Sequence, residues 1–192
     1  MSAVAREIRG GDVRTATKPA DMIANIVAFQ IGWFACVLSA AHGWPWAGTA
    51  TAVAVVAWHA ARAERPAQEL KLIITTVLIG ALWDSALTAL GWITYPSGTL
   101  IAGAAPHWML GLWALFATTL NVSLNWLKGR WLLAATLGAA AGPLSYWGGA
   151  RLGALEFTDP VRALAALAVG WAILTPALLA LASRYDGIHK AN

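Results

Sequence analysis

Apolar residues run through most of this chain in six long stretches, which are separated by short polar links. A helix that crosses a bilayer needs about 20 mostly apolar residues. We therefore predict an all-α transmembrane bundle with a tail over residues 1–20, a membrane domain over 21–185 and a short tail over 186–192. The six predicted spans are Met22–Ala40, Ala47–Ala63, Leu70–Trp92, His107–Leu127, Trp131–Gly149 and Val161–Ser183.

Positive charge is divided unequally between the two sides of this predicted bundle. Of the 13 Lys and Arg residues, all but Arg151 and Arg162 fall on the side that holds both tails. The positive-inside rule then places both termini in the cytosol. The first 20 residues carry four of these cations and no apolar core before a cleavage site, so we expect a partly disordered cytosolic tail up to about Thr17.

The composition supports a membrane protein and excludes several other classes. With 59% hydrophobic and 11% charged residues, the chain is far less charged than a soluble domain, which has about 25%. The net charge of +4 comes from residues that bracket apolar runs, so we expect no nucleic-acid partner. The lone Cys36 allows no intrachain disulfide. His42, His107 and Asp84 could form a two-His-one-carboxylate set, but no short spacing joins them, and we predict no metal site.

Asp84 is the residue that most needs an explanation, because no other charge lies between Lys71 and Trp92. An ionisable residue inside a span is a candidate functional residue. Asp84 could act as a general base or proton carrier, or it could serve as a structural clasp to Arg151 or Tyr146.

The third and fourth spans each have one face of small and polar residues at helical spacing. The residues opposite the polar face of the fourth span, such as Trp113 and Leu120, are bulky and compatible with lipid contact. The two polar faces are Thr76, Gly80, Asp84, Thr88 and Gly91, and His107, Gly111, Ala114, Thr118, Asn121 and Asn125.

Depth along the helices predicts an outward-opening polar pocket with a second polar layer near the cytosol. His107 could relay a proton with Asp84 or act with it as an acid–base pair. The predicted binding residues are Asp84, His107, Tyr146, Trp83, Ser145, Arg151, Asn121 and Asn125, and the inner layer also includes Asn25, His59 and Glu64.

The chain has 12 tryptophans, most of them near predicted span ends, as in an aromatic belt. Four lie nearer mid-span, and for these we favour packing or lipid contact over lining a cavity. They are Trp33, Trp83, Trp113 and Trp171.

Two segments resemble one uncharacterised bacterial family, domain of unknown function 2878. They are Pro106–Leu120 with Ser123–Leu127, and Gly142-Pro-Leu-Ser-Tyr146 with Gly149–Ala154, within a resemblance that begins near Ala24. The resemblance implies a small bacterial inner-membrane protein whose gene lies near those of fatty-acid-modifying enzymes. It implies no activity and no catalytic residue.

Three functional hypotheses follow from these patterns. The first is binding or processing of a lipid or other lipophilic molecule in the intramembrane pocket. The second is a proton-coupled transporter, dimeric, with Asp84 as proton carrier. The third is an accessory subunit that contacts a membrane enzyme through small-residue faces such as Gly138 and Gly142. The sequence indicates no cofactor and does not decide whether a reaction is catalysed.

Overall fold

The computed structural model describes residues 18–189 of the 192-residue chain, and this part is mostly helical. The predicted disorder up to Thr17 lies outside the described residues. The described helices are α2 (Pro19–Ala41), α3 (Pro45–Arg62), α4 (Pro66–Ala89), α5 (His107–Leu120), α6 (Trp131–Arg151) and α7 (Pro160–Arg184), with a short 3₁₀ helix, η1 (Asn125–Leu127).

Proline marks the start of four of these helices. Pro19, Pro45, Pro66 and Pro160 each begin a helix, where the missing N–H would have no intrahelical partner and the fixed φ suits the first turn. These starts lie one to four residues before the predicted ones. The predictions followed the apolar runs, and each run begins after the proline.

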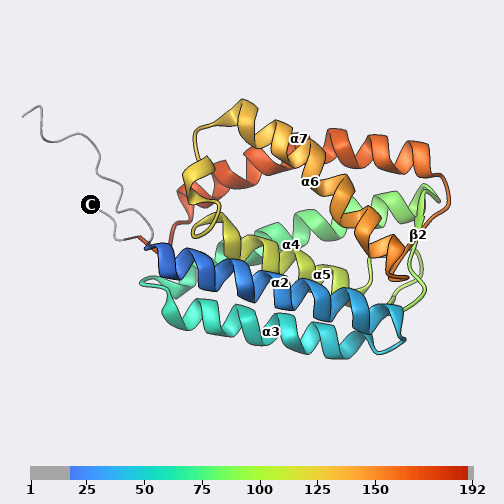
Figure 1. Ribbon diagram of the computed structural model, residues 1–192, viewed down its shortest axis with the longest axis horizontal. Coiled ribbons are helices and arrows are strands. Elements are labelled where there is room, and N and C mark those ends of the chain that lie inside the picture. The colour runs from blue at the N-terminus through green and yellow to red at the C-terminus, as the bar shows by residue number, and fades with distance from the viewer. Residues whose placement is uncertain (1–17, 190–192) are drawn as a thin grey trace, which may run out of the picture.

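Helix α5 lies at the centre of the bundle, between the pair α2 and α3 and the pair α6 and α7 (Figure 1). Its bulky residues Trp113 and Leu120 are 2% and 0% exposed. This bulky face is compatible with lipid contact by its composition, but in the structure it packs inside the bundle. A central helix is covered on every side, so its bulky face packs against neighbouring helices.

Helix α5 has 14 residues and ends at Leu120, before the predicted limit at Leu127. At 1.5 Å per residue it is about 21 Å long, shorter than the hydrocarbon core of a bilayer. Asn121 and Ser123 explain the early end, because their side chains hydrogen-bond to groups outside the helix. The chain then turns through η1 to reach α6.

A small antiparallel pair of strands joins the two long loops at one end of the bundle. Ile93 in β1 (Ile93–Thr94) lies opposite Phe157 in β2 (Glu156–Phe157). This pair is a small addition to a chain that is otherwise helical, as the predicted all-α class requires. Both ends of the described chain lie at the other end of the bundle (Figure 1).

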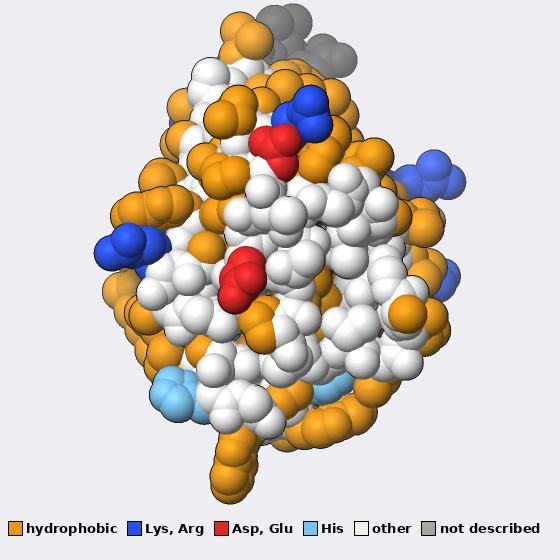
Figure 2. Space-filling view, turned by 90° about the vertical axis from the view of Figure 1, so that its right-hand side faces the viewer, with side chains coloured by type: hydrophobic (Ala, Val, Ile, Leu, Met, Phe, Trp, Pro, Cys, Tyr) orange, Lys and Arg blue, Asp and Glu red, His pale blue; other side chains and the backbone are white. Residues whose placement is uncertain are grey.

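The outer surface of the bundle is apolar along its sides. Three helices, α2, α4 and α7, are long and apolar enough to cross a membrane. Large exposed side chains on them include Ile31, Leu82 and Ile173. Figure 2 shows the end that carries β2, where backbone and polar atoms lie in the middle and hydrophobic side chains around the edge. Apolar sides with polar ends indicate a membrane protein.

Candidate functional site

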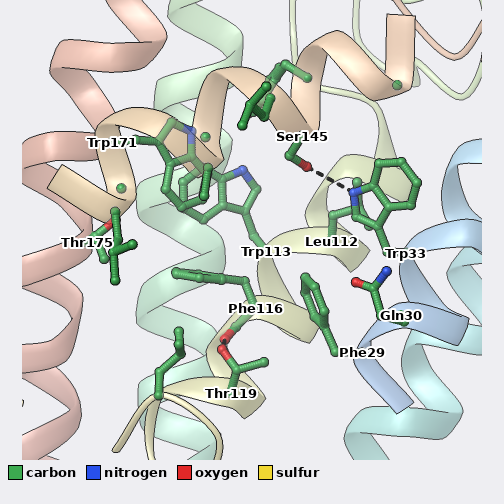
Figure 3. A pocket seen from close by; sticks show the side chains of 18 of the residues that line it. Phe29, Gln30, Trp33, Leu112, Trp113, Phe116, Thr119, Ser145, Trp171 and Thr175 are labelled. Atoms are coloured by element: carbon green, nitrogen blue, oxygen red, sulfur yellow. Dashed lines mark hydrogen bonds between the residues drawn. The ribbon is translucent and has the colours of Figure 1, made fainter. Parts of the chain in front are cut away.

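A cavity of about 760 Å³ lies among α2, α5, α6 and α7. Its volume falls within the range of small-molecule sites. Figure 3 shows labelled side chains from all four helices around this space. Its wall is mainly aromatic and aliphatic, and the aromatic residues are Phe29, Trp33, Trp108, Trp113, Phe116, Trp126, Tyr146 and Trp171.

Two stacked tryptophans form part of this wall. The rings of Trp113 on α5 and Trp171 on α7 lie 4.8 Å apart and are nearly parallel, at 6°. Phe116 meets the Trp171 ring edge-on at 5.2 Å. Gly142 on α6 makes room for Trp171, because a Cβ at that glycine would lie 2.2 Å from the indole. The glycines of α6 thus set the shape of the cavity.

Asp84 lies behind the cavity wall and is completely buried. Its Oδ2 accepts a hydrogen bond from Trp113 Nε1 at 2.6 Å, and its Oδ1 accepts one from the Tyr146 hydroxyl at 2.7 Å. The Tyr95 hydroxyl donates to the same Oδ1 at 2.9 Å. Trp113 and Tyr146 both line the cavity, so the carboxylate holds two wall residues in place.

The partners of Asp84 decide what its carboxylate can do. Among the described residues, its side-chain partners are neutral donors, and no cation pairs with it. Three donors aimed at two oxygens suit an ionised carboxylate, which only accepts hydrogen bonds. Asp84 does not reach the cavity surface, so its geometry suits a positioning role.

The structure places only some of the predicted binding residues together. Ser145 and Tyr146 line the cavity. Trp83 packs against Gly170 on α7, and Arg151 lies over the Trp147 ring at 5.8 Å. The clasp predicted for Asp84 thus forms with Tyr146, while Arg151 lies elsewhere.

His107 also lies away from Asp84. Its Nδ1 is 2.7 Å from the Thr49 hydroxyl, and its ring stacks on Trp46 at 4.0 Å. His42 bonds to the Leu38 carbonyl of its own helix. The structure therefore brings together neither an acid–base pair of His107 and Asp84 nor the possible metal set of His42, His107 and Asp84.

A second polar cluster lies at the opposite end of the bundle from β2. The fully buried Glu69 accepts hydrogen bonds from Asn121 Nδ2 at 2.6 Å and from the Gly187 N–H at 2.8 Å, and its Oε2 lies 2.7 Å from His59 Nε2. His59 and Glu64 were both predicted to lie in the inner polar layer, but Glu64 is exposed, and Glu69 is the partner of His59. Asn25 bonds to Ser123 and to the Thr118 carbonyl, and Asn125 begins η1.

Lys128 extends this cluster to the end of the described chain. Its Nζ donates to Asn121 Oδ1 at 2.6 Å and lies 3.0 Å from Asp186 Oδ2. Burial raises the pKa of Asp186, but the His189 N–H and the Lys128 charge outweigh it, so the pKa lies below its usual value. Residues 186–189 of the predicted tail thus pack against the helices.

The aromatic wall of the cavity was not predicted from the sequence. Trp33, Trp113 and Trp171 line the cavity, although packing or lipid contact was the favoured interpretation. The available signal was the pair Gly138 and Gly142 on α6, which leaves room for large side chains. The sequence does not say which helix supplies those side chains.

The chain matches one known protein family. The family model DUF2878, described as a protein of unknown function, matches residues 22–177. The chain belongs to this family. The residues matched to DUF2878 include the whole cavity wall, from Ile26 to Thr175, together with Asp84. No curated protein and no solved structure matches the chain.

Proposed function

We propose that this protein is an integral protein of the bacterial cytoplasmic membrane that binds or processes a lipid or other lipophilic molecule. The proposal includes six membrane-crossing helices with both termini in the cytosol. It is supported by three long apolar helices, by the apolar sides of the bundle and by the concentration of Lys and Arg on one predicted side.

The single observation that supports binding is the aromatic cavity. Along α6 its wall runs from Leu137 to Gly149, about 18 Å at 1.5 Å per residue. An elongated apolar space of this kind suits a hydrocarbon chain or another long apolar molecule. Thr175 adds a polar group to the wall, since its buried hydroxyl has no hydrogen-bond partner among the described residues.

The edges of the cavity suggest entry from the bilayer. Ile26 on α2 and Leu137 and Leu144 on α6 line the cavity and are also exposed, at 45%, 42% and 64%. Exposed apolar residues at the edge of a cavity allow an apolar ligand to enter without crossing water. We therefore propose lateral access between α2 and α6, in place of the outward opening that the sequence suggested.

The test is native mass spectrometry with lipid analysis on purified protein. Wild type is expected to retain a specific lipophilic compound. Leu112→Trp, which adds bulk to the cavity wall (Figure 3), is expected to lose it. Leu82→Trp makes the same change on the outer face of α4, where Leu82 is 75% exposed, and should leave retention intact.

The proposal fails if the cavity variant and the surface variant retain the same compounds as wild type. It also fails if wild type retains only bulk lipid while both variants keep the wild-type fold by circular dichroism.

The other two hypotheses find less support. A proton carrier needs access to protons, whereas Asp84 is completely buried and engaged by three donors. A partner-binding face on α6 needs free glycines, whereas a Cβ on Gly138 or Gly142 would collide with α7 of the same chain. Lipophile binding is therefore the function that we propose.

A further inference from the structure

One end of the cavity lies beside an arginine. Trp126 and Leu127 line the cavity at the end away from β2. Leu127 also borders a second cavity of about 230 Å³, which Gly129 and Arg130 help to line. The guanidinium of Arg130 lies over the Trp126 ring, 5.6 Å from its centroid. A cation therefore stands at the point where the apolar wall ends.

Arg130 differs in its partners from Arg62 and Lys128, two cations near the same end of the bundle. Arg62 pairs with Asp21 at 2.7 Å, and Lys128 pairs with Asp186 at 3.0 Å. Within residues 18–189, no carboxylate lies within ion-pair distance of Arg130. Its exposed guanidinium can therefore form charge-assisted bonds to an anion that reaches the end of the cavity.

The opposite end of the cavity is less suited to an anion. Arg151 lies there over Trp147, but Trp147 does not line the cavity. Glu156 and Asp159 belong to the same end, and Figure 2 shows acidic side chains on that face. They offset the positive charge of Arg151 and Arg162 at this end, where the Arg162 guanidinium lies 3.4 Å from the Asp159 carboxylate. The charge distribution therefore distinguishes the two ends.

We propose that the ligand is an anionic amphiphile, with its hydrocarbon chain in the cavity and its carboxylate or phosphate at Arg130. This inference rests on the proposed function and specifies its ligand class. Trp126 contributes twice, because it lines the apolar cavity and also supports the guanidinium by a cation–π contact. The head group then lies on the side of the bundle that holds both ends of the described chain.

The test compares two probes that differ only in the head group. Binding of 9,10-dibromostearic acid and of dibromostearyl alcohol is measured at pH 8 by bromine quenching of tryptophan fluorescence in neutral detergent. Wild type should bind the acid about tenfold more tightly than the alcohol or better, as a charge-assisted contact predicts. Arg130→Gln should reduce this preference to within about twofold while leaving alcohol binding unchanged.

Arg62→Gln is the matched control, because Arg62 lies over Trp58 in a similar arrangement at 5.2 Å and neither residue lines the cavity. It should keep the preference for the acid. A second pair, brominated phosphatidylglycerol and phosphatidylcholine with identical chains, shows whether the anion comes from a phospholipid or a free fatty acid. Preference for either anionic member that depends on Arg130 supports the proposal.

Each contrary result overturns a defined part of the argument. If wild type binds the acid and the alcohol equally, and Leu112→Trp weakens both, the protein does not recognise an anionic head group. The proposed lipophile site would still be supported. If Arg151→Gln loses the preference for the acid and Arg130→Gln keeps it, the head group lies at the end beside Arg151, and the proposed position is wrong. Failure of wild type to bind any of the four probes overturns the proposed function together with this inference.

Discussion

Trp33 donates a hydrogen bond from Nε1 to the Ser145 hydroxyl at 3.0 Å and thereby joins α2 to α6 across the cavity (Figure 3). Both residues line the cavity, and α2 and α6 are the helices between which we propose that the ligand enters. A single bond between a ring and a small hydroxyl can break without disturbing the helices. This contact is therefore well placed to control the exchange of a bound molecule.

Ser145→Ala removes this contact with little change in volume. Since one hydrogen bond contributes about 0.5–1.5 kcal/mol, release of a bound brominated lipid should become about two- to tenfold faster. Stopped-flow recovery of tryptophan fluorescence measures this rate. Thr136→Ala is the control, because the Thr136 hydroxyl bonds to the Leu133 carbonyl of its own helix. Equal release rates in the two variants would show that the contact has no such role.

Asp84→Asn should destabilise the fold. Asn offers one acceptor oxygen and presents an NH₂ group where the second oxygen was, so either Trp113 or the two tyrosines face another donor. Each buried donor left unpaired costs about 1–3 kcal/mol.

Thermal unfolding in detergent, followed by near-ultraviolet circular dichroism, should show a lower midpoint and an altered signal from the Trp113–Trp171 stack. Glu156→Gln changes an exposed acid in β2 and should match wild type. An Asp84→Asn protein as stable as wild type would mean that the carboxylate is not needed for packing.

Gly138→Ala should weaken the packing of α6 on α7. A Cβ there would lie 2.3 Å from the Trp171 carbonyl oxygen, which is backbone and cannot rotate away. Overpacking of this kind costs about 1–3 kcal/mol. Gly148→Ala on the same helix meets its nearest neighbour, Trp33, at 3.6 Å and should be tolerated. Comparing the two unfolding midpoints tests the contact, and equal midpoints would contradict it.

Stability should depend on pH through Asp186. Its folded-state pKa lies below the usual value, despite burial, because the His189 N–H and the Lys128 charge favour the carboxylate. The stabilisation is therefore fully present above the unfolded-state pKa, about 3.9, and is lost as pH falls through the lower folded-state value.

Asp186→Asn should lower the unfolding midpoint at pH 7, and its difference from wild type should shrink below about pH 4. Unfolding midpoints between pH 7 and pH 3 measure this difference. A difference that stays constant over this range would contradict the ionic contribution.

The proposed six-span topology predicts opposite labelling of the two ends of the bundle. Ala67→Cys, at the start of α4, should react with an impermeant thiol reagent only from the cytosolic side, and Leu100→Cys only from the other side. The native Cys36 is 0% exposed and should stay unlabelled. Labelling of both new cysteines from one side would overturn the topology.

The sequence by itself determined that the chain is mostly helical, because long runs of apolar residues are local signals. It also singled out Asp84, since a carboxylate in an apolar run is conspicuous wherever it points. It did not determine where α5 ends, because Asn121 leaves the helix to bond with Glu69, which is 52 positions away.

Only the tertiary structure decided which residues form the site. Tyr95, Trp113 and Tyr146 come from a loop and two helices, and they meet at Asp84 because the bundle brings those elements together. Helical periodicity predicts which face of its own helix a residue lies on, but it does not predict which other helix packs against that face. For the same reason, Trp113 is compatible with lipid contact by its place in the sequence, although α5 lies at the centre of the bundle and its indole helps to form the cavity wall.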